Sequence, residues 1–109
     1  MPEHVRRAVV LDAAVARFAE HGRTGTTIDD IAEVTGVRKP AIYEMFGSKD
    51  DLFRAAVEHV ATTLAAQFRV TNAEVSELPR AERTRARIDA ALRYAEKDPR
   101  GLELLVRAP

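Results

Sequence analysis

The 109-residue sequence contains no cysteine, so disulfide bonds and thiolate metal sites are excluded. No apolar run approaches the roughly 18 residues needed to span a membrane, and no basic-then-apolar leader precedes the first predicted helix. We therefore expect a cytoplasmic protein with no membrane partner. Aromatic residues make up only 6% of the sequence, while alanine is abundant and glycine and proline are scarce. Alanine loses least on entering a helix, so this composition favours an all-α fold.

An excess of positive charge is also missing. The 17 basic residues equal the 17 acidic ones, and residues 1–54 hold 8 basic against 9 acidic residues, a net charge of −1. Nucleic-acid binders often carry a clear basic excess. Overall charge therefore gives no support for a nucleic-acid partner, and such a function would depend on how the charges are arranged locally.

Little in the sequence points to catalysis or metal binding. His4, His21 and His59 lie far apart, and no two of them have the i, i+4 spacing of a helical metal site. No nucleophile–base–acid arrangement, glycine-rich phosphate loop or plausible carboxylate pair is present. We expect neither an enzyme nor a bound cofactor.

Apolar residues at helical spacing predict five helices and the start of a sixth. The predicted helices cover residues 3–20, 28–35, 39–46, 49–70, 80–97 and 101–107. Residues 71–79 are polar and end in Pro79, which predicts a linker, and Asp98-Pro99 predicts a break between the last two helices.

Two of these helices carry apolar stripes that predict burial. In the first helix the stripe consists of Val10, Leu11, Ala14, Val15 and Phe18. In the long fourth helix it consists of Leu52, Phe53, Ala56, Val57, Val60, Ala61, Leu64, Ala65 and Phe68. The fifth helix is expected to bury Ile88, Ala91, Leu92 and Ala95.

The two short helices have the spacing of a helix-turn-helix. Ala32 is small where the two helices would cross, and Gly36 supplies the positive φ that a tight turn requires. Thr27 is placed to cap the first of the two, and Pro40 fits the first turn of the second. The predicted core positions of the motif are Ile31, Ala32, Gly36, Val37, Ile42 and Phe46.

The second short helix is then the predicted recognition helix, which enters the major groove by its N-terminal end. Its leading residues, Arg38 to Ala41, concentrate positive charge where phosphates and base edges would lie. Arg38 or Lys39 can donate to guanine O6 and N7, and Ala41 can touch a thymine methyl group.

Flanking residues offer further contacts with the DNA backbone. Tyr43 carries a hydroxyl for a phosphate, and Lys49 stands at the start of a helix, where free amides also favour an anion. Thr27 can offer its hydroxyl and amide on the other side. Two alternatives remain open. Tyr43 can be an aromatic residue at the edge of the core, and Arg38 and Lys49 can be solvated charges.

The sequence resembles the TetR family of bacterial transcriptional regulators over about residues 8–60. The residues that carry the resemblance are 10–14 (VLDAA), 18–22 (FAEHG), 26–32 (TTIDDIA), 36–37 (GV), 42–43 (IY), 46–49 (FGSK) and 52–53 (LF). Several separate motifs therefore occur in the family's order.

Two positions depart from the family pattern. Members commonly have glycine where Pro40 stands and histidine where Met45 stands, so Met45 removes an expected polar backbone contact. Glu44 is an acidic residue on the predicted recognition helix. The complete set of candidate DNA-binding residues is Thr27, Arg38, Lys39, Pro40, Ala41, Tyr43, Met45 and Lys49.

The resemblance implies a three-helix DNA-binding domain over residues 1–48 and part of a helical ligand-binding and dimerisation domain over residues 49–109. It implies a ligand-responsive regulator, most often a repressor, that binds a pseudo-palindromic double-stranded operator as a homodimer. Such a protein is expected in the bacterial cytoplasm, in association with the nucleoid, and responds to a small-molecule inducer. The alternative, motivated by the neutral charge, Met45 and Glu44, is a helical protein-interaction module that keeps the fold without operator binding.

Overall fold

The computed structural model describes residues 2–108, and these residues form six helices and no strand. The helices are α1 (Glu3–His21), α2 (Ile28–Thr35), α3 (Lys39–Phe46), α4 (Lys49–Val75), α5 (Arg80–Lys97) and α6 (Pro99–Arg107). The all-α fold expected from the composition is confirmed.

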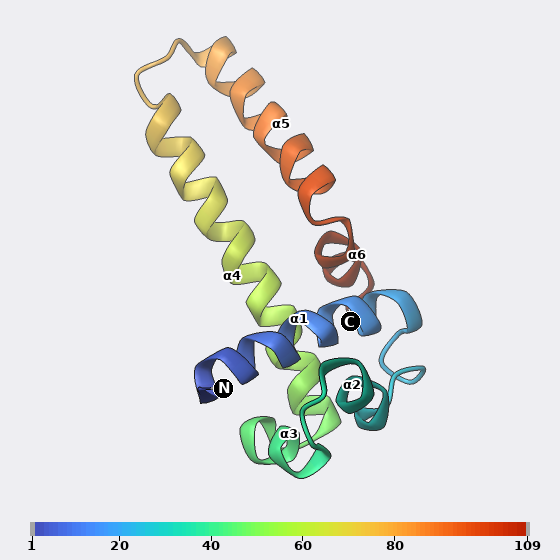
Figure 1. Cartoon of the computed structure of the whole chain (residues 1–109). Coiled ribbons are helices and arrows are strands. Elements are labelled where there is room, and N and C mark those ends of the chain that lie inside the picture. Colours follow the sequence, from blue (N-terminus) through green and yellow to red (C-terminus); the bar gives the residue numbers. More distant parts are fainter. Residues whose placement is uncertain (1, 109) are drawn as a thin grey trace.

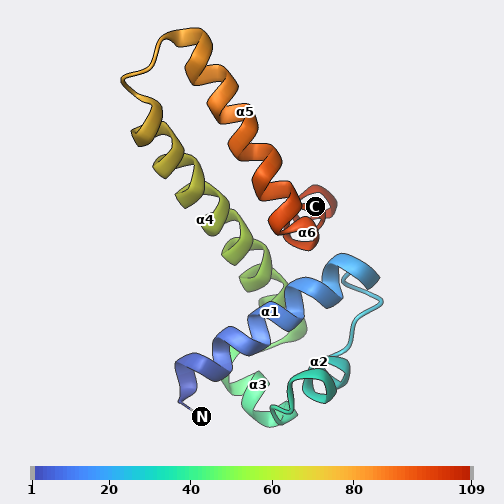
Figure 2. The same cartoon turned by 45° about the horizontal axis from the view of Figure 1, so that its top comes forward.

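Helices α1, α2 and α3 gather at one end of the molecule, and α4 leads from them into a long antiparallel hairpin with α5 (Figure 1). Helix α5 returns the chain toward α1, and the short α6 then lies beside α1, as the turned view also shows (Figure 2). The resulting shape is elongated, with extents of 53 × 29 × 19 Å. Helix α6 therefore brings a late part of the chain onto the N-terminal helices.

The predicted linker at residues 71–79 is wrong over its first half, because α4 continues to Val75. Thr71 and Asn72 are weak helix formers, which explains the earlier predicted end. In the folded chain, Asn72 Oδ1 accepts a hydrogen bond from Arg87 Nε of α5 at 2.7 Å, and Val75 is buried. These contacts with the neighbouring helix outweigh the local preference, and only residues 76–79 connect the two helices.

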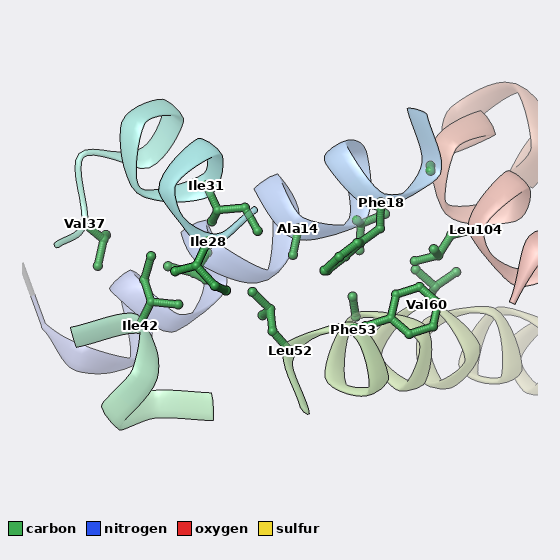
Figure 3. Close-up of a cluster of buried hydrophobic side chains, with 14 residues drawn as sticks. Ala14, Phe18, Ile28, Ile31, Val37, Ile42, Leu52, Phe53, Val60 and Leu104 are labelled. Carbon is green, nitrogen blue, oxygen red and sulfur yellow. The ribbon is translucent and has the colours of Figure 1, made fainter. Parts of the chain in front are cut away.

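The core lies where α1, α2, α3 and the first half of α4 meet (Figure 3). The ring of Phe18 on α1 meets the ring of Phe53 on α4 edge to face, with centroids 5.1 Å apart and an interplanar angle of 87°. Leu104 of α6 belongs to the same cluster and is 1% exposed. Burying an aliphatic or aromatic side chain of this size contributes about 1.5–3 kcal/mol. The interior is therefore shared by the N-terminal helices and α6.

Burial of the apolar stripe of α4 is confirmed only for its first half. Leu52, Phe53, Ala56 and Val60 are buried, whereas the stripe opens to solvent beyond them. The stripe residues that are exposed are Ala61, Ala65 and Phe68, and those that are partly buried are Val57 and Leu64.

The expected burial of the apolar face of α5 is wrong at three of its four positions. Ile88 and Leu92 are 55% and 58% exposed, Ala91 is also exposed, and Ala95 is partly buried. The inner side of α5 instead buries Tyr94. Within the described residues, α5 packs mainly against α4 and touches α6 at its end, so most of its circumference has no neighbouring helix.

One residue joins α5 to α6. Asp98 ends α5 and caps α6, because its Oδ1 accepts a hydrogen bond from the Gly101 amide at 3.0 Å. Its Oδ2 accepts a hydrogen bond from the Tyr94 hydroxyl at 3.3 Å. Burial raises the pKa of Tyr94, and the neighbouring Asp98 carboxylate raises it further. The sixth helix begins at Pro99, two residues before the predicted start, since proline suits a helical first turn.

Candidate nucleic-acid interface

Helix α2 begins at a reciprocal cap between Thr27 and Asp30. The Thr27 hydroxyl oxygen accepts a hydrogen bond from the Asp30 amide, and Asp30 Oδ2 accepts one from the Thr27 amide, both at 3.1 Å. The hydrogen bonds from Thr27 hold the pKa of Asp30 below its ordinary value. The Thr27 amide predicted for a phosphate is thus already engaged with Asp30, whereas the Thr27 side chain is exposed.

The loop before this cap is fixed by Thr26, which sequence reasoning did not single out as a structural residue. Its side chain is fully buried, and its hydroxyl lies 2.9 Å from the Gly22 carbonyl oxygen and 3.1 Å from that of Arg17. Arg17 lies near the end of α1 and Gly22 directly follows it, so Thr26 ties the start of α2 to the end of α1. A threonine directly before a capping threonine was too weak a signal for this role.

The turn between α2 and α3 depends on Gly36. Its φ of 73° and ψ of 4° are left-handed, and its amide donates to the Ala32 carbonyl oxygen at 2.9 Å. A Cβ atom at this position would meet no other atom within 4 Å. The need for glycine is therefore conformational and not steric. Thr35 supports the same turn, because its hydroxyl oxygen accepts a hydrogen bond from the Val37 amide at 3.1 Å.

The predicted core positions of the motif lie on its inner side. Ile31 of α2 and Ile42 of α3 are 0% and 1% exposed, and Val37 of the turn is also buried. Ala32 and Phe46 are partly buried and pack against the same cluster. The two helices are thus held together by aliphatic side chains from α2, the turn and α3, as Figure 3 shows for Ile31, Val37 and Ile42.

The outer side of α3 carries most of the candidate DNA-binding residues. Arg38, Lys39 and Pro40 are exposed at its N-terminal end, and Ala41 is partly buried. Tyr43 is 40% exposed, so this residue is accessible to solvent. Residues at the start of α3 are therefore accessible from outside, while the opposite side of the helix is packed.

An ion pair connects this end of α3 to α2. Lys39 Nζ lies 3.2 Å from Asp29 Oδ1, and the side chains are 46% and 73% exposed, respectively. Part of the positive charge predicted for DNA is thus compensated within the protein. Arg38 forms no ion pair within residues 2–108.

Met45 and Lys49 lie at the other end of α3. Met45 is partly buried and packs against the core. Lys49 is partly buried in the first turn of α4, which Ser48 caps by accepting a hydrogen bond from the Asp51 amide at 3.0 Å. Asp51 is exposed beside it, so this helix start combines one basic residue with acidic ones.

Arg7 of α1 has a role that the sequence did not reveal. Its guanidinium lies 4.4 Å from the centre of the Phe46 ring, and its Nη1 donates to the Met45 carbonyl oxygen at 3.2 Å. Both contacts fall on the last turn of α3, where a cation also complements the helix dipole. Arg7 therefore fixes the end of α3 against α1.

No group of three or more histidine, aspartate or glutamate side chains among residues 2–108 is placed to hold a metal ion. None of the helices described is both long and apolar enough to cross a membrane.

The arrangement of α1, α2 and α3, with α2 and α3 joined by a left-handed glycine and packed through Ile31 and Ile42, defines the class of helix-turn-helix domains. Residues 10–56 match the model of the family described as bacterial regulatory proteins, tetR family. The chain belongs to this family, as its resemblance in sequence indicated.

Relatives and one solved structure agree with this assignment. The chain is 30% identical to the HTH-type transcriptional activator FasR of Mycolicibacterium smegmatis, across 96% of this chain and 47% of that protein. It is 35% identical to the HTH-type transcriptional repressor ComR of Escherichia coli, across 61% of this chain and 31% of that protein. These relatives are named as regulators, in agreement with the non-enzymatic class expected from the sequence.

The crystal structure of a TetR-like transcriptional regulator from Rhodococcus sp. RHA1 superposes with a TM-score of 0.88 at 29% identity, covering 98% of this chain and 57% of that one. The chain thus spans about half the length of the proteins that it matches over nearly all of its own length.

Proposed function

We propose that this chain contains the DNA-binding domain of a transcriptional regulator, with α3 as the recognition helix. The observation that carries the proposal is the two-sided character of α3. Ile42 is buried against the core, while Arg38, Lys39 and Tyr43 are exposed. A helix held in this way can enter the major groove by its N-terminal end without disturbing the core.

The proposed roles follow from exposure and chemistry. Lys39 donates to the acceptors of a guanine edge, and the exposed Arg38 pairs with a phosphate. Pro40 and the methyl group of Ala41 lie beside them on the first turn, where they provide apolar contact with a thymine methyl group. Together these residues form the proposed surface for reading base edges.

Residues on either side of α3 are proposed to contact the backbone of the DNA. The hydroxyls of Tyr43 and Thr27 and the ammonium group of Lys49 donate to phosphates. Met45 has a different part in the proposal. Because it packs against the core, it acts mainly by supporting α3.

The regulatory half of the proposal concerns residues 49–109. We assign them to a helical domain that forms a homodimer and responds to a small-molecule inducer, with residues 1–48 as the DNA-binding domain. The exposed apolar side chains of α4 and α5, among them Phe68 and Leu92, support this division. Two DNA-binding domains related by a two-fold axis then bind a pseudo-palindromic operator. The named relatives include an activator and a repressor, and repression is the outcome we propose here.

An electrophoretic mobility shift assay tests the proposal with the full-length protein and genomic fragments, beginning with the region that flanks its own gene. We expect retarded DNA and a log affinity that falls linearly with log salt. The double substitution Lys39→Ala, Tyr43→Phe should weaken this binding, because it removes one base contact and one phosphate contact. Unchanged affinity of the double variant would contradict the assignment of α3 as the recognition helix.

The second candidate function is a helical protein-interaction module. It is favoured by the neutral overall charge and by the exposed Glu44 on α3, which would oppose a polyanion if it faced one. Complete absence of retarded DNA at low salt, for a folded full-length protein, would support this candidate over the first.

A further inference from the structure

The ion pair between Asp29 and Lys39 is unusual among those of the described chain because it joins two helices. Within residues 2–108, the other ion pairs lie inside α1 or α6. Asp29 stands in the first turn of α2 and Lys39 at the start of α3, so the pair bridges the two N-terminal ends of the helix-turn-helix. Its oxygen–nitrogen distance of 3.2 Å is that of a direct contact.

Stabilisation of the fold is a poor explanation for this pair. Both side chains are substantially exposed, and ion pairs of this kind contribute little to stability. The neighbouring Asp30 already forms the cap of α2, so Asp29 is not needed for that purpose. What the pair does determine is the position and the electrostatic surroundings of the Lys39 ammonium group.

The two kinds of acceptor that DNA offers would respond differently to this pair. A lysine ammonium group has three donors, so it can keep Asp29 as one partner and still donate to the neutral O6 or N7 of guanine. A phosphate oxygen is negatively charged, and its approach to the same ammonium group would place it beside the Asp29 carboxylate. Asp29 therefore opposes phosphate binding more than it opposes binding to a base edge.

We propose that Asp29 is a specificity-determining residue, which directs Lys39 toward base edges and away from the phosphates of arbitrary DNA. The inference rests on the proposed function of α3. It assigns to an acidic residue on the DNA-facing motif a role in rejecting wrong sequences, whereas the other exposed basic residue of this turn, Arg38, remains available to any phosphate.

The test compares Asp29→Asn with Glu33→Gln in the full-length protein. Glu33 is an exposed acid of α2 that forms no ion pair within residues 2–108, so its substitution controls for the general loss of one negative charge. Two probes are used: a short duplex that the unmodified protein selects from a random-sequence pool, and a scrambled duplex of the same composition. Dissociation constants are measured by fluorescence anisotropy over a range of NaCl concentrations.

We expect Asp29→Asn to tighten binding to the scrambled duplex about two- to fivefold per protomer, and to tighten binding to the selected duplex less. The slope of log affinity against log salt for the scrambled duplex should become steeper by about 0.9 per protomer, because Lys39 then neutralises one more phosphate. The ratio of the affinity for the selected duplex to the affinity for the scrambled duplex therefore falls. Glu33→Gln should change both affinities by a similar, smaller factor.

The Lys39→Ala background makes the test specific to the pair. There, Asp29→Asn should have no more effect than Glu33→Gln, because the residue on which Asp29 acts is gone. Two results would overturn the inference and leave the proposed function standing. One is that Asp29→Asn and Glu33→Gln change the two affinities equally in the unmodified background. The other is that Asp29→Asn still has the larger effect on affinity when Lys39 has been replaced by alanine. Failure of the unmodified protein to select any duplex would overturn both.

Discussion

Arg107 of α6 donates a hydrogen bond from its Nη1 to the carbonyl oxygen of Ala19, 2.8 Å away on the last turn of α1. The last carbonyl groups of a helix have no partner within the helix itself. In α1 the Phe18 carbonyl accepts from the Gly22 amide, which directly follows the helix, and the Ala19 carbonyl accepts from Arg107, so the bonds to the end of this helix come from two different segments. The end of α1 is therefore defined in part by a residue 88 positions later in the chain.

Replacing Arg107 by methionine should lower the free energy of unfolding by about 1 kcal/mol. A hydrogen bond from a charged donor can contribute more, but the side chain is about half exposed, and solvent reduces its effect. Urea denaturation followed by circular dichroism measures the change. Arg100→Met, a substitution of an exposed arginine on the same helix, serves as the control and should leave stability nearly unchanged.

Leu104→Ala should destabilise the 109-residue chain by about 2–5 kcal/mol, the range for a large aliphatic side chain removed from a packed core. Leu104 is 1% exposed and joins α6 to the cluster formed by α1 and α4. Leu92→Ala removes the same atoms from a side chain that is 58% exposed, so it should change stability far less. Equal losses for the two variants, measured by thermal and urea unfolding, would show that α6 is not packed on the core.

Gly36→Ala should lower stability by about 1 kcal/mol, because a residue with a Cβ atom adopts positive φ at a cost even where there is room for it. Asparagine tolerates the left-handed region better than alanine does. Gly36→Asn should therefore retain more stability than Gly36→Ala, although its side chain is larger. The reverse order in urea denaturation would point to steric crowding instead.

The cap of α2 predicts a dependence of stability on acid. Because the pKa of Asp30 is lower in the folded chain than its ordinary value of 3.8, the unfolded chain binds a proton more readily. The contribution of this group is thus present above about pH 4 and is lost as the pH falls through the folded pKa. Asp30→Asn should lose less stability than the unmodified chain between neutral and acidic pH. Thr27→Val should show a partial reduction, since it removes the hydroxyl but keeps the amide.

Most of the helix-turn-helix could be predicted from the sequence, because residues at the ends of α2 and α3 determine where these helices begin and end. The bounds of α2 and α3 were predicted to the residue, since Thr27, Gly36 and Pro40 each leave a signal at a helix end. The positions of Asp29 and Arg7 relative to α3 were not predicted. Both depend on contacts between side chains of different helices, and no local pattern encodes them.

The hairpin of α4 and α5 was predicted less well, for a related reason. Periodic apolar residues such as Phe68 and Ile88 indicate that a face is suited to burial, but not which segment covers it. The end of α4 was also placed too early, because the hydrogen bond between Asn72 and Arg87 lies between two helices. Helix ends that carry capping residues can thus be predicted from the sequence, whereas the burial of a face and the end of α4 depend on contacts with a neighbouring helix.

The joint between α5 and α6 has a consequence for how the sequence can change. A Cβ atom on Gly101 would collide with the Asp98 carboxylate, which accepts a hydrogen bond from the Gly101 amide and so caps α6. A substitution at Gly101 therefore displaces the cap, whereas after Asp98→Ala the atoms with which the new Cβ would collide are gone. The two positions are epistatic: the order in which they mutate determines how deleterious each step is, and the pair is expected to persist or to be lost together.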